Sequence, residues 1–254
     1  MKLPENLPHF DAVSRGEALR LLCAHEYGFP PAQPDAVEFR EGLADDAFCA
    51  GKAVLCRIEA DVRQNGKRFT FPFHFVCPKS AQPVPAAVFI NFTPAVPDPY
   101  FPAEELCDLG FAMFSFGYAD VSPDDDDFAA KAGAVLNINR SDPHAPGKIA
   151  VWAWAARIVM DYVQTRSEID LQNVAVAGHS RLGKTALLAA ALDERFARRT
   201  VTFIAPSKTF NMAGLSTSVV IVPDDSLRRR LQTELAKLHA DQGNICLLYT
   251  SPSP

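Results

Sequence analysis

Apolar and polar residues alternate near the start of the chain in a pattern that is typical of paired strands. Residues 11–27 carry apolar side chains at helical spacing and predict an amphipathic helix ahead of these strands. Residues 52–62 alternate as a strand with one buried face does, and residues 69–76 resume the alternation. Between them, Asn65-Gly66 favours a two-residue turn because both positions accept positive φ. We therefore predict an antiparallel hairpin at the start of the sheet.

Short apolar runs further along the chain predict strands that are buried on both faces. These runs are residues 86–90, 111–116 and 174–177. Residues 148–163 show the single apolar stripe of a helix packed on a sheet, and residues 184–192 favour a helix by composition. Strands that alternate with helices are joined by crossovers, which favour parallel pairing. The pattern predicts an α/β fold with a mostly parallel sheet.

The last of these runs leads into the motif Gly178-His-Ser-Arg-Leu-Gly183, with Ser180 at its centre. A strand, a tight turn flanked by glycines and a helix form the layout of a nucleophile elbow, in which a serine is held on a strained turn. The helix N-terminus supplies free N–H groups and the positive end of a dipole, which stabilise a developing oxyanion. Ser180 is therefore a candidate nucleophile for acyl transfer. The alternative is that it only caps the helix.

The spacing Ser180-Arg-x-Gly-Lys, with its glycine one residue later than in Gly-x-Ser-x-Gly, resembles the glucuronoyl esterase family of carbohydrate esterases. The flanking stretches Ile149-Ala-Val-Trp-Ala-Trp-Ala-Ala156 and Ala191-Leu-Asp-Glu-Arg-Phe-Ala197 resemble the same family, and the resemblance covers about residues 1–197. It implies a truncated α/β-hydrolase that cleaves a carboxylic ester of a carbohydrate, of the glucuronoyl or acetyl-xylan type, through an acyl-enzyme on Ser180. The family commonly has cysteine where this chain has His179, so the reaction class is better indicated than the substrate.

The same resemblance implies roles for residues around the serine. Arg181 matches an arginine that helps to stabilise the oxyanion, and Lys184 matches a lysine that contacts sugar hydroxyls. Without the resemblance, either cation could be a solvated surface residue. Trp154 lies off the apolar stripe of its helix and is a candidate sugar contact, whereas Trp152 lies on the stripe and is expected in the core.

A serine hydroxyl needs a base to become a good nucleophile, and histidine is the usual base. In α/β-hydrolases the acid and the histidine follow the serine along the chain. Here only His239 follows Ser180. His179 is adjacent to the serine and is expected to point away from it, and His74 and His144 come too early. The triad is therefore expected to be incomplete and this chain poorly active or inactive.

The chain changes character after Ala197. Residues 198–245 are expected to be a foreign segment. Within it, residues 201–245 resemble the lysine-bearing segment of pyridoxal-phosphate enzymes of the aminotransferase fold, on Ser207-Lys-Thr-Phe-Asn211 and Gly214, with a strand and a helix after them. The resemblance is to the cystathionine β-lyase-like branch and implies a Schiff base on Lys208. Residues 246–254 resemble a translated sequencing-adapter remnant. We therefore expect a chimeric chain whose esterase-like part uses no cofactor. A pyridoxal-phosphate lyase or aminotransferase fragment and a non-catalytic fragment remain alternatives.

Composition narrows the choice of partners. The chain has 254 residues, 48% of them hydrophobic, with a net charge of −5, which disfavours a general nucleic-acid binder. No apolar stretch approaches the about 20 residues of a membrane helix.

The first residues lack an apolar signal region, and the 6 cysteines form no CxxC pair, which predicts free thiols in a cytoplasmic protein. The acidic run Asp124–Asp127 is expected to be a solvated loop rather than a metal site. Oligomeric state and natural ester stay open.

Overall fold

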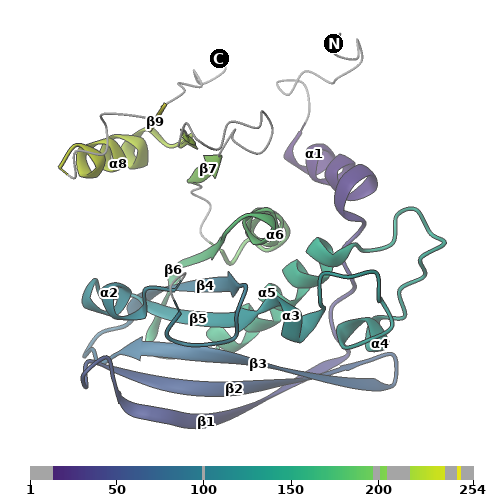
Figure 1. The fold of residues 1–254 in the computed structure, drawn as a ribbon, viewed down its shortest axis with the longest axis horizontal. Helices are drawn as coiled ribbons and strands as arrows, with labels where there is room; N and C mark the ends of the chain where they lie inside the picture. The colour runs from purple at the N-terminus through teal and green to yellow at the C-terminus, as the bar shows by residue number, and fades with distance from the viewer. Residues whose placement is uncertain (1–13, 99–100, 197–200, 205–217, 238–244, 247–254) are drawn as a thin grey trace. The chain divides into compact units, whose positions relative to one another are not determined.

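The computed structural model describes residues 14–98, 101–196, 201–204, 218–237 and 245–246 (Figure 1). The chain folds as two compact units, Met1–Ala197 and Arg198–Pro254. The division falls where the sequence changes character. A foreign origin of the second unit stays a prediction.

The first unit contains, in its described residues, a six-stranded sheet in the order β1-β2-β3-β5-β4-β6. The strands are β1 (Ala36–Phe48), β2 (Ala53–Gln64), β3 (Lys67–Pro78), β4 (Val84–Asn91), β5 (Ala112–Gly117) and β6 (Ile169–Gly178). The pairings from β1 through β2 and β3 to β5 are antiparallel, and β4 pairs in parallel with both β5 and β6. The predicted α/β class is confirmed. The sheet is mixed rather than mostly parallel, because parallel order is confined to the three strands that crossover helices connect.

The predicted hairpin is present, and its turn explains why it forms where it does. Gln64 pairs with Lys67, so Asn65 and Gly66 make up the whole connection. Their φ values of 53° and 71° are the positive values that a tight hairpin turn requires. The sequence patterns did not predict β1, which lies at one edge of the sheet. Most of its residues are exposed, so it carries no apolar run that would reveal it.

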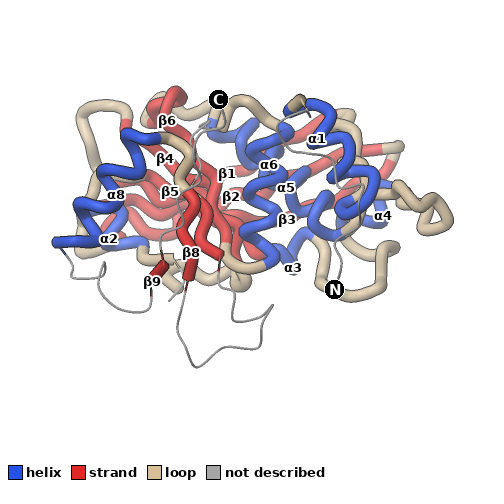
Figure 2. Tube along the Cα trace, turned by 90° about the horizontal axis from the view of Figure 1, so that it is seen from above, coloured by secondary structure: helices blue, strands red, loops and turns tan. Residues whose placement is uncertain are grey.

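Helices lie on both faces of this sheet. The helices of the first unit, in its described residues, are α1 (Arg15–Leu22), the π-helix η2 (Cys23–Tyr27), α2 (Ala103–Asp108), α3 (Tyr118–Val121), α4 (Ala132–Leu136), α5 (Lys148–Val163) and α6 (Arg181–Leu192). The bounds of α5 are those that its apolar stripe predicts. The short helices α3 and α4 lie between β5 and α5 along the chain. Figure 2 shows α5 and α6 side by side, and the two helices are in contact.

The alternation of side chains along each strand divides the core into two layers. Phe75 and Phe114 stack at 4.5 Å in the larger layer, which also contains Trp152 and Trp154 of α5. Their sequence neighbours Val76 and Met113 face the other way, into a smaller layer under α2 that is completed by Ala53, Leu55, Phe101, Ala103 and Cys107. Both faces of the sheet are therefore covered, which fits the continuous apolar runs of β4 and β5.

The second unit has its own small sheet. In its described residues, β7 (Thr202–Ile204), β8 (Ser218–Ile221) and β9 (Ile245–Cys246) pair in that order, and α8 (Asp225–Lys237) follows β8. The expected strand and helix after the lysine segment are thus present. Across the described residues of both units, no helix is both long enough and apolar enough to cross a bilayer.

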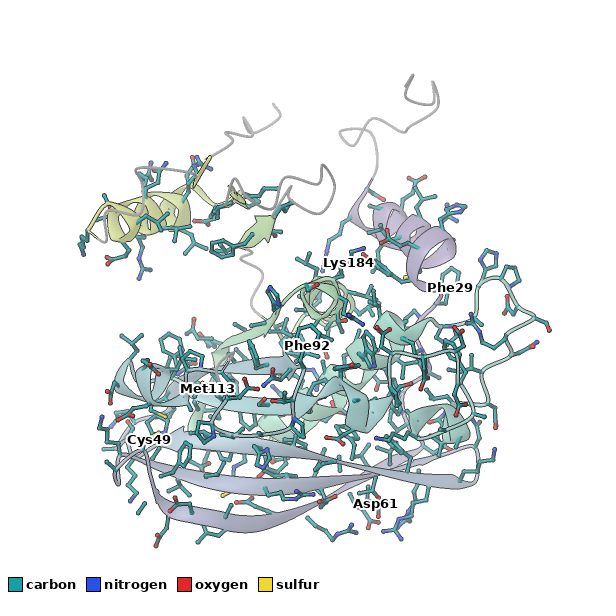
Figure 3. The ribbon with its side chains drawn as sticks, in the orientation of Figure 1. Phe29, Cys49, Asp61, Phe92, Met113 and Lys184 are labelled. Carbon is teal, nitrogen blue, oxygen red and sulfur yellow. The ribbon has the colours of Figure 1, made fainter. Side chains whose placement is uncertain are left out.

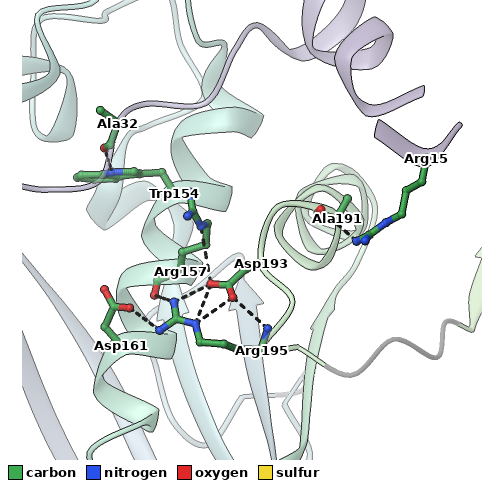
Figure 4. Close-up of polar contacts among 8 residues, drawn as sticks. All are labelled: Arg15, Ala32, Trp154, Arg157, Asp161, Ala191, Asp193 and Arg195. Atoms are coloured by element: carbon green, nitrogen blue, oxygen red, sulfur yellow. Dashed lines mark hydrogen bonds and ion pairs between the residues drawn. The ribbon is translucent and has the colours of Figure 1, made fainter. Parts of the chain in front are cut away.

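An ionic network around the buried Asp193 joins the end of α6 to α5 (Figure 4). Asp193 is 6% exposed and accepts hydrogen bonds from Nε and Nη2 of Arg195 at 2.9 and 2.6 Å. Arg157 Nε lies 3.7 Å from the same carboxylate, and Arg195 also reaches Asp161 at 2.7 Å. Burial raises the pKa of Asp193, but the hydrogen bonds and charges of the two arginines outweigh it and leave that pKa below its ordinary value.

Replacing Asp193 by alanine is expected to destabilise the first unit. Two arginines would lose their shared partner, and their partial exposure reduces the cost of a broken buried pair to about 2 kcal/mol. Urea unfolding measures the loss of free energy. Glu38→Ala is the control, since the Glu38–Arg63 pair has both side chains more than half exposed, at 59% and 52%; that change should stay within about 0.5 kcal/mol. Equal effects of the two substitutions would contradict the buried role of Asp193.

The buried carboxylate of Asp61 makes the free energy of unfolding of the first unit depend on pH. Its side chain is 0% exposed and is paired with Arg68 and Arg40. Hydrogen bonds from Arg68 lower the pKa of Asp61 below its ordinary value, and this outweighs the effect of burial. The stabilisation is therefore present above the unfolded pKa of about 3.9 and is lost as the pH falls through the lower folded pKa.

The free energy of unfolding of the wild-type chain should accordingly fall more steeply below about pH 4 than that of Asp61→Asn. Urea titrations at a series of acidic pH values measure both slopes. Asp126→Asn, at an exposed aspartate, should keep the wild-type slope. A wild-type slope in Asp61→Asn would show that the carboxylate of Asp61 does not supply this pH dependence.

Candidate active site

Ser180 occupies the turn between β6 and α6, with its backbone in a strained conformation. Its φ and ψ are 58° and −124°, a region that residues with a Cβ rarely adopt. The residue is exposed, and its carbonyl accepts the N–H groups of Gly183 and Lys184 at 3.0 and 3.3 Å. These bonds begin the helix immediately after the serine. The turn therefore presents the Ser180 side chain outward at a helix N-terminus, as a nucleophile elbow does.

A close backbone contact requires glycine at position 178, and Gly183 also lies in tight backbone packing. A Cβ on Gly178 would lie 2.3 Å from the carbonyl oxygen of Leu182, which no real side chain tolerates. A Cβ on Gly183 would lie 3.2 Å from the oxygen of Gly178. The strand end thus packs directly on the first helical turn. This contact explains why the second glycine stands three residues after the serine.

The elbow lies at the carboxyl ends of the parallel strands, where α/β sheets place their sites. Ile90 of β4 is in register with Gly178 of β6, so the residues after β4 lie beside the elbow. Phe92 packs edge-on against the ring of His179, with centroids 6.1 Å apart. Figure 3 shows Phe92 and Lys184, which mark the strand end and the helix that flank the turn. Phe92 also contacts Tyr118, which begins α3.

Both predicted cations lie at the elbow, and each has an acidic partner. Arg181 forms an ion pair with Asp124, and its guanidinium carbon lies 5.8 Å from the centroid of the Phe92 ring. Lys184 Nζ lies 3.3 Å from Oε1 of Glu26, in η2. The structure thus brings Arg181 and Lys184 together with Ser180, as the sequence motif predicts. The sequence gives no sign of Glu26, whose segment reaches the elbow only through the fold.

Backbone donors for an oxyanion are fewer than the topology suggests. The N–H of Phe92, directly after β4, donates to the Asn91 side chain at 2.8 Å. Asn91 is 1% exposed and is itself held by Asp98 at 2.9 Å. The N–H of Arg181 donates to no backbone carbonyl in the part of the chain that the structure describes. In a nucleophile elbow the N–H of the residue after the serine is an oxyanion donor, and Arg181 holds that position in this chain.

Trp154 does not fit its predicted role as a sugar contact. Its side chain is 0% exposed, and its Nε1 donates to the carbonyl of Ala32 at 2.9 Å (Figure 4). A ring enclosed in this way has no face open to a ligand. Trp152 is in the core, as expected, and donates to the carbonyl of Ser122 at 2.7 Å. The helix is buried around most of its circumference, so lying off the stripe did not expose Trp154.

The structure places three of the four candidate histidines. His179 packs against Phe92. His74 is half-buried in β3, where burial lowers its pKa below the ordinary value, and His144 Nδ1 lies 3.1 Å from the carbonyl oxygen of Ala24. His239 and Lys208 lie outside the described residues. Their predicted roles therefore stay predictions.

The acidic run is more structured than a solvated loop. Asp124 and Asp125 remain 39% and 50% exposed, but the first is paired with Arg181 and the second with Lys148 at 3.1 Å. Among the described residues, no three His, Cys, Asp or Glu side chains come together in a way that could hold a metal ion. The run thus contributes ion pairs at the edge of the candidate site.

The mixed sheet and the strained turn define an α/β fold that presents a serine in nucleophile-elbow geometry. The family model described as glucuronyl esterase, fungi, matches residues 60–207, which is more than half of the chain. The chain belongs to this glucuronoyl esterase family of carbohydrate ester hydrolases. The match runs past Ala197 and ends one residue before Lys208.

Individual relatives agree with this assignment. Carbohydrate esterase MZ0003, from an unknown prokaryotic organism, is 57% identical over 51 residues, or 20% of this chain and 12% of its own length. The 4-O-methyl-glucuronoyl methylesterase of Podospora anserina is 28% identical over 191 residues, or 73% of this chain and 35% of its own. The CE15 glucuronoyl esterase of Teredinibacter turnerae T7901 superposes with a TM-score of 0.60 and 25% identity, over 72% of this chain and 49% of that structure. The chain thus spans half or less of the length of these relatives.

Gly178→Ala is expected to disrupt the elbow. The added methyl group would clash with the Leu182 carbonyl, so the first unit should lose more than about 1 kcal/mol of unfolding free energy. Urea unfolding measures this loss. Gly16→Ala in α1 is the control, because a Cβ there meets nothing within 4 Å; it should be neutral or slightly stabilising. Unchanged stability in Gly178→Ala would contradict the close packing of the turn.

Proposed function

We propose that Ser180 is the nucleophile of an ester hydrolase that cleaves a carboxylic ester of a carbohydrate. The observation that carries the proposal is the strained backbone of an exposed serine at the start of α6. Strain of this kind persists only where the surrounding structure enforces it, and it is concentrated at functional sites. Membership of the glucuronoyl esterase family and the curated name of the Podospora anserina relative support a glucuronoyl ester as the substrate. An acetyl-xylan type of ester is the second candidate.

The proposed reaction proceeds in two steps. Ser180 Oγ loses its proton to a base and attacks the ester carbonyl, and the tetrahedral intermediate then expels the alcohol to leave an acyl-enzyme. Water attacks the acyl group and releases the carboxylic acid. The N–H and guanidinium of Arg181 stabilise the oxyanion in both steps. Lys184, in the first turn of the same helix, binds hydroxyl groups of the sugar.

The base limits the rate that we expect from this chain. His239 is the one histidine after Ser180 in the sequence, and it belongs to the segment that resembles a different family. We therefore propose that turnover is slow, while the serine keeps the reactivity that its turn and helix N-terminus confer. A pyridoxal-phosphate enzyme that uses Lys208 is the alternative, and the family match favours the esterase. A protein-bound internal aldimine seen by its absorbance after cofactor addition would revive the alternative.

Covalent labelling tests the nucleophile without requiring complete turnover. A fluorophosphonate should modify Ser180 in the intact chain, and peptide mass spectrometry should locate the adduct on that residue. Ser180→Ala should lose labelling, whereas Ser115→Ala, at a buried serine of β5, should keep it. The wild-type chain should also hydrolyse a methyl glucuronate ester slowly, and Ser180→Ala should abolish this. Labelling at another serine, or none at all, would refute the assignment.

A further inference from the structure

The acidic run beside the elbow is fixed in place by a buried lysine. Lys148 begins α5, and its side chain is 9% exposed. Its Nζ donates to Ser122 Oγ at 3.0 Å, to Asp125 Oδ1 at 3.1 Å and to the carbonyl oxygen of Asp127. The Phe128 ring packs on the same ammonium group, at 4.4 Å from its centroid. The ammonium group of Lys148 thus binds Ser122, which precedes the acidic run, and two residues within the run, Asp125 and Asp127.

Asp124 lies in this fixed segment and reaches the elbow. Its carboxylate forms the ion pair with Arg181, immediately after Ser180. The Phe92 ring lies on the same guanidinium. A carboxylate from the loop and an aromatic face from the end of β4 therefore hold one side chain. Since Arg181 is 46% exposed, little else restricts its rotamers.

We propose that Asp124 is a positioning residue, which holds the guanidinium of Arg181 beside Ser180 before substrate binds. This inference rests on the proposed function, in which Arg181 stabilises the oxyanion. A free arginine samples many rotamers, and ordering it during the reaction costs entropy. A donor that is already in place avoids that cost when the charge develops. In this proposal Asp124 acts through Arg181 and takes no part in making or breaking bonds.

The acidic run contains its own matched control. Asp126 carries the same charge two residues away, is exposed, and makes no hydrogen bond or ion pair within the described part of the chain. Asp124→Asn and Asp126→Asn therefore remove equal charge from the same loop. Only the first breaks the contact with Arg181. A difference in rate between the two variants therefore measures the contact with Arg181 and not the loss of negative charge from the loop.

The experiment measures the second-order rate constant for modification of Ser180 by a fluorophosphonate, whose tetrahedral adduct places an oxygen where the oxyanion would form. Asp124→Asn should react about tenfold more slowly, which corresponds to about 1.4 kcal/mol of transition-state stabilisation. Asp126→Asn should react at the wild-type rate. Asp124→Glu, which keeps the carboxylate, should recover most of the loss. Thermal unfolding of each variant verifies that it is folded.

A double-substitution cycle separates positioning from a structural effect. If Asp124 acts through the guanidinium, adding Asp124→Asn to Arg181→Ala should cause no further loss of rate. A further tenfold loss in that background would overturn the proposal, and so would a wild-type rate in Asp124→Asn alone. Failure of the proposed function has a different signature, since the wild-type chain would then show no modification of Ser180. That result would remove the role of Arg181 and overturn this proposal with it.

Discussion

The candidate site depends on one close backbone contact, the approach of Gly178 to the carbonyl group of Leu182. This contact lets β6 turn into α6 without a connecting loop, and it holds Ser180 at a positive φ that its Cβ disfavours. The cost of that conformation is offset by helix hydrogen bonds from Gly183 and Lys184 and by burial of Leu182 in the core. The exposure of Ser180, the start of α6 at Arg181 and the spacing of Gly178 and Gly183 all follow from this one turn.

The fold brings the other site residues to this turn from distant parts of the chain. Parallel pairing of β4 with β6 places Phe92 beside His179, and the loop after α3 carries Asp124 to Arg181. Glu26 reaches Lys184 from η2, near the start of the described chain. Both cations of the motif are thus balanced by carboxylates that are remote in sequence. The elbow supplies the cations, and the tertiary structure supplies the charges that hold them.

Much of the first unit could be predicted because local patterns and tertiary contacts agree there. The Asn65-Gly66 turn, the continuous apolar runs and the stripe of α5 each specify an element without reference to the rest of the chain. The predictions that failed depended on information that no local pattern contains. The sheet direction changes between β3 and β5, which only the pairing reveals. The position of Trp154 off the stripe predicts a candidate sugar contact, yet the residue is buried and its Nε1 donates to the carbonyl of Ala32.

The sequence by itself determined the α/β class, the hairpin and the serine turn, because each follows from spacings of a few residues: a positive-φ pair, an apolar period, and glycines where backbones meet. It also determined the identity of the two cations next to Ser180, since they belong to the same helical turn. The tertiary structure decided which groups restrain those cations, which tryptophan faces are covered, and which strands run in parallel. These features arise from contacts between residues far apart in the chain, and such contacts produce no local residue pattern from which they could be predicted.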